Sequence, residues 1–189
     1  VYGDVLLTYQ QQIGDFSLSG TLGGSITDRK YDSSGLDSYP GGIYSPNIFT
    51  LANLDLNAGS INQGKGHSQE QSVFFAGQVG YKDWLFLDVT ARNDWTSSLA
   101  FTKSKNKGFF YPSVGLTWVL NESLKLPEWV SLGKVRGAWS QVGNGLPNYI
   151  SNPLHSVGAG GNITFNTTAP FSELKPEKTS SIEFGTEWR

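Results

Sequence analysis

Apolar and polar residues alternate along the stretch Phe16-Ser17-Leu18-Ser19-Gly20-Thr21-Leu22-Gly23-Gly24-Ser25-Ile26. In an extended chain, its apolar side chains fall on one face and its serines and threonine on the other. This period of two predicts a β-strand with one apolar face and one wet face. The segment from Val5 to Gln12 alternates in a similar way, and Ile13-Gly14-Asp15 joins the two, so the sequence predicts a hairpin here.

Five further segments carry this alternation. In the segment 84–95, Leu85, Leu87 and Val89 oppose charged and polar side chains, which can occupy their face only if it is wet. The chain is therefore predicted to be all-β, an antiparallel up-and-down meander of about seven strands. The expected strands are residues 5–12, 16–26, 71–81, 84–95, 110–120, 132–142 and 178–188.

The predicted connections alternate between short and long. Residues 13–15 and 82–83 form tight turns, whereas Thr27 to Glu70 and Asn144 to Glu177 are long loops rich in Gly, Ser, Asn and Pro. Loops of more than about 15 residues are uncommon in compact soluble domains. Tight turns at one edge and wide loops at the other are the layout of an outer-membrane β-barrel.

Composition narrows the class of protein further. The 189 residues carry 14 Lys+Arg and 16 Asp+Glu, a formal charge of −2, which gives no electrostatic basis for binding nucleic acid. The sequence has no apolar run long enough for a spanning helix, and a closed barrel is the other structure that satisfies its backbone in lipid. With no methionine at the start, the chain is expected to be an internal piece of a longer protein.

Aromatic residues favour the barrel, because girdles of aromatic side chains flank its lipid-facing band. The girdle expected at the short-turn ends contains Tyr9, Tyr81, Trp84, Trp118 and Trp188, and the girdle expected toward the long loops contains Phe75, Trp95, Phe110, Tyr111 and Trp139. The alternative, from a different class, is a soluble β-sandwich carbohydrate-binding module whose core the aromatics fill. In the barrel, the side chains expected to face lipid include Leu18, Leu22, Leu87, Val89, Val114, Leu116, Ile182 and Phe184.

Four segments, taken in order, carry a more specific signal: Ala91 to Leu99, Phe110 to Trp118, Lys134 to Asn144 and Leu174 to Gly185. They resemble successive barrel motifs of the SusC/RagA family of TonB-dependent outer-membrane transporters. The resemblance covers most of residues 71–189, whereas residues 1–70 match only in the general alternating pattern of their strands. It implies that residues 1–189 are part of the β-barrel domain, with the plug and the N-terminal region absent, and that the whole barrel has roughly 22 strands.

The same resemblance implies a function. Such proteins import glycans or peptides across the outer membrane of Bacteroidetes-type bacteria, draw energy through TonB, and work beneath a SusD-like surface lipoprotein. The expected partners are therefore this lipoprotein, outer-membrane lipid, an oligosaccharide or peptide substrate, and TonB through parts of the protein outside these residues. No cofactor is implied.

The sequence predicts no enzyme activity. A catalytic nucleophile needs a positioned base, and His67 and His155, the two histidines, are expected in loops with no motif around them. A metal site needs three or four convergent ligands, so we interpret both as exposed loop side chains.

Two groups of residues are candidates for function. Asp88, Arg92 and Asp94 lie on the polar face of one strand, and we interpret them as a lumenal ion-pair network that orders the barrel wall, with substrate contact as the alternative. Ligand contact is expected from the long loops, where aromatic and amide side chains can bind sugars or peptide backbone. The candidates there are Tyr39, Tyr44, Asn148, Tyr149 and Phe171, although tyrosines also suit packing of one loop on another.

Overall fold

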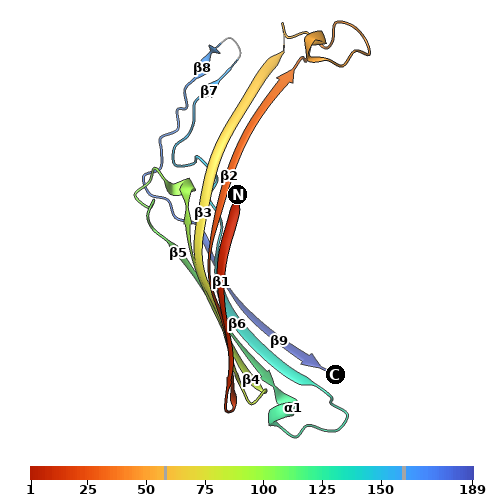
Figure 1. The fold of residues 1–189 in the computed structure, drawn as a ribbon, viewed down its shortest axis with the longest axis vertical. Coiled ribbons are helices and arrows are strands. Elements are labelled where there is room, and N and C mark those ends of the chain that lie inside the picture. Colours follow the sequence, from red (N-terminus) through yellow and green to blue (C-terminus); the bar gives the residue numbers. More distant parts are fainter. Residues whose placement is uncertain (58, 159–160) are drawn as a thin grey trace.

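The structure is a computed structural model that describes residues 1–57, 59–158 and 161–189. In these residues it contains one seven-stranded antiparallel sheet, in the order β1-β2-β3-β4-β5-β6-β9 (Figure 1). The predicted all-β meander is therefore confirmed. The strands are β1 (Tyr2–Ile13), β2 (Phe16–Asp37), β3 (Ser60–Tyr81), β4 (Leu85–Thr96), β5 (Phe109–Val119), β6 (Gly133–Gly143) and β9 (Lys178–Trp188).

Short elements occupy the connections. They are the 3-10 turns η1 (Leu51–Asn53) and η2 (Ser97–Leu99), the helix α1 (Leu120–Ser123), and a small hairpin of β7 (Ser156–Val157) and β8 (Ile163–Thr164). Within the described ranges, no helix is both long and apolar enough to cross a bilayer.

The register of the strand pairs gives the sheet an apolar face, which we call the outer face. Leu18 lies opposite Val79, Val79 opposite Leu87, and Leu87 opposite Leu116. The four side chains therefore form one continuous apolar row across β2 to β5, because directly paired residues project from the same side of a sheet.

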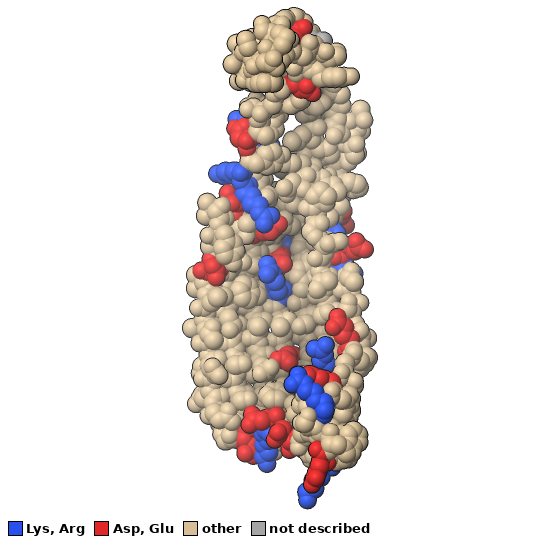
Figure 2. Space-filling view, turned by 90° about the vertical axis from the view of Figure 1, so that its right-hand side faces the viewer, with Lys and Arg blue, Asp and Glu red and all other residues tan. Residues whose placement is uncertain are grey.

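The other face, which we call the inner face, is polar. Thr8 lies opposite Thr21 with their hydroxyl oxygens 3.3 Å apart, and Thr90 lies opposite Ser113 with the corresponding distance 2.6 Å. Charges on the side of the molecule seen in Figure 2 are mixed, with acidic and basic side chains beside one another. The wall thus has an apolar side and a hydrated side.

No second layer covers the outer face within the described part of the chain. Leu22 is 51% exposed and Phe184 is 85% exposed, and the buried apolar side chains among the described residues are Leu99, Phe109 and Leu120. The one other sheet described is the β7–β8 hairpin. Because a β-sandwich buries such faces between two sheets, the alternative prediction of a soluble sandwich is wrong. The outer face needs an apolar environment supplied from outside the chain.

Strands β2 and β3 extend far beyond their neighbours (Figure 1). Their pairing continues without a break to Asp37 opposite Ser60, so residues 38–59 alone connect them. The predicted loop from Thr27 to Glu70 is therefore wrong. We call the projecting part, residues 28–37 and 60–69, the arm.

The sequence did not predict the strands of the arm, because both faces of the arm are exposed to water. Beyond Ile26, the outer-face positions of β2 become Asp28, Lys30 and Asp32. The alternation that marks a half-buried strand therefore ends there. The backbone ladder continues all the same, and Lys65 Nζ lies 3.2 Å from the Asp32 carboxylate across it.

At the opposite edge, tight turns and aromatic rings form a belt. The ring centroids of Phe16 and Tyr81 are 4.9 Å apart, those of Tyr81 and Trp84 5.7 Å, and those of Trp84 and Trp118 6.4 Å. The two turn residues 82–83 both have positive φ, 48° and 58°, as a type I′ hairpin turn requires. The structure thus brings three members of the predicted short-turn girdle, Tyr81, Trp84 and Trp118, into one row.

Candidate binding site

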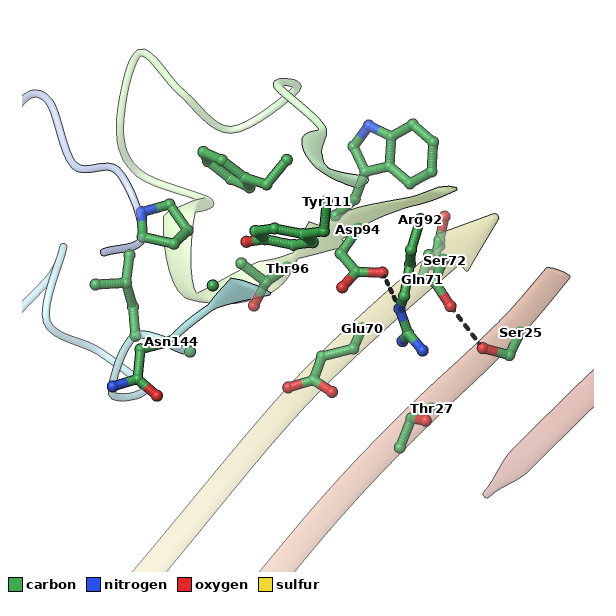
Figure 3. A pocket seen from close by; sticks show the side chains of 16 residues that line it. Ser25, Thr27, Glu70, Gln71, Ser72, Arg92, Asp94, Thr96, Tyr111 and Asn144 are labelled. Carbon is green, nitrogen blue, oxygen red and sulfur yellow. Dashed lines mark hydrogen bonds and ion pairs between the residues drawn. The ribbon is translucent and has the colours of Figure 1, made fainter. Parts of the chain in front are cut away.

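A cavity of about 280 Å³ opens on the inner face, where β4 and β5 reach their long-loop ends beside the middle of β2 and β3 (Figure 3). The Ser25 and Ser72 hydroxyls, on neighbouring strands of its wall, hydrogen bond to each other at 2.7 Å. Its other polar lining groups include Thr27, Glu70, Thr96 and Asn144. Hydroxyl, amide and carboxylate groups therefore converge on one space on the inner face.

Arg92 and Asp94 provide the paired charges of this cavity. Arg92 Nε lies 2.6 Å from Asp94 Oδ1, and the two side chains are 54% and 34% exposed. The Arg92 guanidinium also lies over the Phe74 ring, 6.0 Å from its centroid. Within the described residues, no hydrogen bond or ion pair engages the Nη groups of Arg92. Arg92 can therefore hold Asp94 and still donate to a ligand.

The structure does not place Asp88 in this pair. Asp88 Oδ1 accepts a hydrogen bond of 2.7 Å from Gln78 Nε2, its partner across β3 and β4. Arg92 lies four residues further along β4, which is about 14 Å of extended strand. The three residues interpreted as one network therefore occupy two separate places on the inner face.

Tyr111 lines the cavity, contrary to its expected place in the lipid-facing girdle. Its ring covers Gly143, and Lys178 Nζ lies 5.6 Å from the ring centroid. Its neighbour Phe110 is 50% exposed and projects the other way. Adjacent residues of a strand point to opposite faces, so only one of this aromatic pair can face lipid.

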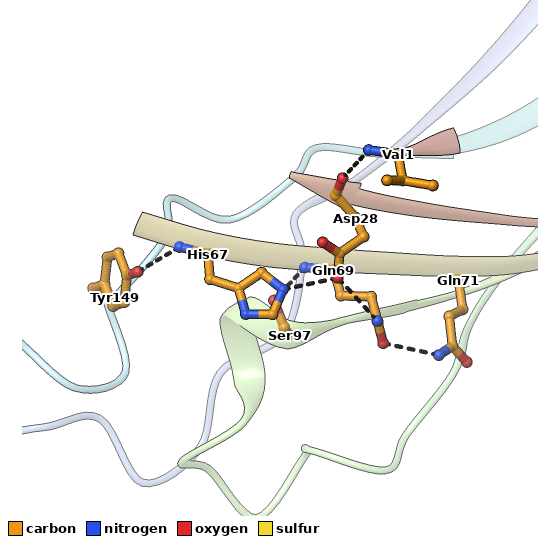
Figure 4. Close-up of polar contacts among 7 residues, drawn as sticks. All are labelled: Val1, Asp28, His67, Gln69, Gln71, Ser97 and Tyr149. Carbon is orange, nitrogen blue, oxygen red and sulfur yellow. Dashed lines mark hydrogen bonds and ion pairs between the residues drawn. The ribbon is translucent and has the colours of Figure 1, made fainter. Parts of the chain in front are cut away.

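Of the loop candidates, Asn148 and Tyr149 lie beside the arm. The Ser98 hydroxyl lies 3.2 Å from Asn148 Oδ1, and the backbone N–H of His67 donates to the Tyr149 hydroxyl at 2.9 Å (Figure 4). These contacts tie the connection that follows β6 to β3 and to η2.

His67, expected in a loop, lies within β3. Its Nε2 lies 2.8 Å from Asp28 Oδ2, and Gln69 Nε2 donates to the same oxygen at 3.3 Å (Figure 4). The hydrogen bond with His67 lowers the pKa of Asp28 from its ordinary value. This cluster joins the two strands at the base of the arm.

The remaining candidates lie elsewhere. Tyr39 and Tyr44 belong to the connection at the far end of the arm, where Tyr39 is 82% exposed and the Tyr44 hydroxyl donates to Asp55 at 3.0 Å. Bonds from the backbone of Asn57 and from the Tyr44 hydroxyl lower the pKa of Asp55. Phe171, 48% exposed, lies in the connection before β9. The five loop candidates therefore do not form one site.

Sequence reasoning did not select Glu70, Ser25, Ser72 or Asn144, which line the cavity with Arg92. The small polar residues at alternate positions of the sequence did indicate a strand face that is exposed to water. Their convergence depends on register across β2, β3 and β4, which a single sequence does not give.

Comparison with known proteins places the chain in a family. The family model described as "TonB dependent receptor-like, beta-barrel" matches residues 2–189. No protein of curated function matches the sequence.

Solved structures share the fold. "Structure of the RagAB peptide transporter" matches with a TM-score of 0.75 at 20% identity, covering 98% of this chain and 22% of that chain. "Structure of the RagAB peptide importer in the 'open-open' state" matches with a TM-score of 0.77 at 21% identity, covering 98% of this chain and 21% of that chain. This chain thus spans about a fifth of the length of those proteins. With its two-faced meander and the family match over nearly all its residues, the chain belongs to the TonB-dependent receptor-like β-barrel family.

Proposed function

We propose that this chain forms seven adjoining wall strands of an outer-membrane importer of peptides that is energised through TonB and closed by a SusD-like surface lipoprotein. The observation that carries the proposal is the division of one sheet into an uncovered apolar face and a polar face that holds a cavity. A wall between lipid and a hydrated lumen needs that division.

The height of the apolar band supports a membrane position. On β2 it runs from Phe16 to Ile26, ten residue steps, before Asp28 begins the polar arm. At about 3.4 Å per residue and a strand tilt of about 40°, this distance projects to about 26 Å, close to the apolar band of outer-membrane barrels. The arm then projects beyond the bilayer on the long-loop side.

The cavity chemistry favours peptides over neutral glycans. Arg92 carries donors free of described partners, and Glu70 and Asp94 supply carboxylates beside it. A peptide offers both a carboxylate and an ammonium group to such a site, in addition to amide groups, and charge-assisted hydrogen bonds are the stronger ones. The structurally similar RagAB proteins are described as a peptide transporter and a peptide importer.

The proposal is tested by uptake into cells that produce the intact transporter. We expect labelled peptides to enter in a TonB-dependent manner, and Arg92→Ala to reduce uptake about tenfold through loss of a charge-assisted hydrogen bond. The matched control is Arg136→Ala, which removes the same residue type from the inner face nearer the short-turn edge. Uptake of oligosaccharides but not of peptides would overturn the substrate assignment.

The far end of the arm is the surface we propose for the lipoprotein. Phe49 is 86% exposed and Leu51 is 71% exposed in the connection 38–59, which Figure 1 places at the end farthest from the short turns. Exposed apolar clusters of this kind mark protein contacts. Phe49→Asp is expected to reduce co-purification of the lipoprotein with the intact transporter, whereas Val157→Asp, in the β7–β8 hairpin, serves as the control. Equal loss in both variants would contradict the assignment.

A further inference from the structure

One edge of the arm has no partner strand among the residues that the structure describes. β4 pairs with β3 from Tyr81 up to Glu70, which lies opposite Thr96, where β4 ends. Residues 60–69 of β3 therefore pair with β2 on one side only. In an antiparallel strand, alternate residues direct their backbone N–H and C=O groups to opposite sides, so every second residue of this segment faces the open side.

Two side-chain contacts identify which residues these are. The backbone N–H of Gln69 donates to the Ser97 hydroxyl at 2.9 Å, and that of His67 donates to the Tyr149 hydroxyl at 2.9 Å (Figure 4). Both amides therefore point away from β2, and hydroxyl groups from other parts of the chain occupy the place of a neighbouring strand.

Backbone direction repeats every two residues along a strand. Toward the start of β3 from His67, the N–H and C=O groups that face the same open side therefore belong to Lys65, Gln63 and Ile61. In the described part of the chain, no hydrogen bond engages these groups. They repeat about every 7 Å, the spacing that an added antiparallel strand requires. The edge thus presents a row of backbone donors and acceptors.

A cavity adjoins this row. It has a volume of about 470 Å³ and is lined by Tyr31, Lys65, Gly66, His67 and Tyr149, among others. Lys65 and Asp32 pair their charges at this surface, and Lys30, which also lines the cavity, adds a positive charge. A side chain of a strand lying along the edge has room there.

We propose that an extended peptide cargo adds as a strand to the open edge of β3 along Ile61, Gln63 and Lys65, with one of its side chains in the adjoining cavity. This inference rests on the proposed function of peptide import. Backbone pairing recognises any peptide that can extend, irrespective of most of its side chains. A glycan lacks alternating amide donors and acceptors at this spacing, so the same edge selects peptides over sugars.

The test is peptide binding to the intact transporter with its lipoprotein in lipid nanodiscs. Gln63→Pro removes an N–H on the open side and leaves the β2 ladder in place, because proline is accepted on an edge strand with its nitrogen facing outward. We expect about tenfold weaker binding from loss of this donor and from the ring in the path of the added strand. Gln63→Ala is the matched control, which loses the same side chain but keeps the N–H, and should bind within about twofold of the parent.

Peptides N-methylated at every second residue give a second readout. Methyl groups in one phase block the N–H groups that face β3, and methyl groups in the other phase face away, so the two peptides should differ about tenfold in affinity. Equal affinity of the two phases, or unchanged binding to Gln63→Pro, would overturn edge pairing while leaving peptide import intact. Self-association abolished by Gln63→Pro, without an effect on peptide binding, would assign the edge to a second copy instead. If the intact transporter took up no peptide, both the proposed function and this inference would be refuted.

Discussion

A single arginine placed on the outer face of β2 gives the sharpest test of the membrane assignment. Leu22 lies on that face, 51% exposed and opposite Leu7 and Phe75. It is six residue steps from Phe16 and four from Ile26, which correspond to about 16 Å and about 10 Å of depth at a 40° tilt. Leu22 therefore lies near the middle of the apolar band.

An arginine near the bilayer midplane of a barrel costs about 2–4 kcal/mol. Leu22→Arg should reduce the free energy of unfolding of the intact barrel by that amount. Phe16→Arg, at the edge of the band, should cost about 0.5–1.5 kcal/mol, mainly through the lost ring contact with Tyr81, because its charge reaches the interface. Ser19→Arg is the matched control on the same strand, since Ser19 lies on the inner face between Gln10 and Gln78, and should change stability by about 0.5 kcal/mol or less.

The measurement is guanidinium unfolding of the full-length protein folded into lipid vesicles, followed by tryptophan fluorescence. We expect the loss of unfolding free energy to be largest for Leu22→Arg, smaller for Phe16→Arg and smallest for Ser19→Arg. Equal losses at Leu22 and Ser19 would refute the assignment of lipid to one face and water to the other, and a cost at Phe16 as large as that at Leu22 would refute the proposed depth of the band.

Three smaller predictions follow from individual contacts. Gly23→Val should cost about 1–3 kcal/mol in the same unfolding assay, because a Cβ there would overlap the Phe74 ring, and Phe74→Ala should recover part of the loss. Arg92→Gln should change stability by less than about 1 kcal/mol, since its ion pair is exposed; a larger loss would make it a structural residue. The lowered pKa of Asp28 implies that its bond with His67 stabilises the arm above the ordinary Asp pKa of 3.8 and that this stability is lost as pH falls through the lowered value. Protection of the His67 amide against hydrogen exchange, relative to its intrinsic rate at each pH, should therefore decrease below that pH, and Asp28→Asn should abolish this decrease.

The candidate site was predictable only in part. Alternation along β4 placed Arg92 and Asp94 on one wet face, and the structure brings them within 2.6 Å because side chains two residues apart on a strand are neighbours. The same rule wrongly joined Asp88 to them, because it bonds instead to Gln78 of the adjacent strand. A pattern within one strand does not specify which residue of the next strand lies opposite.

The arm illustrates the same limit for the fold. The apolar rows of β2 to β5 produce a period of two that reads directly as strands, since one side of each faces an apolar environment and the other faces water. Residues 28–37 have water on both sides, so no burial imposes a period and backbone pairing alone holds them extended. Polar, glycine-rich strands of this kind resemble loops in sequence.

The sequence by itself determined the number of strands in the main sheet, the tight turns and the two-sided character of the wall, because each follows from local alternation and turn chemistry. The tertiary structure decided what lies across each strand: the cavity around Arg92, the inward position of Tyr111, and the open edge at Gln63. These features depend on register and on where a neighbouring strand ends. The register and the end of a neighbouring strand are both set by pairing between segments that are distant in the chain. Such pairing produces no periodic pattern within the sequence of either segment.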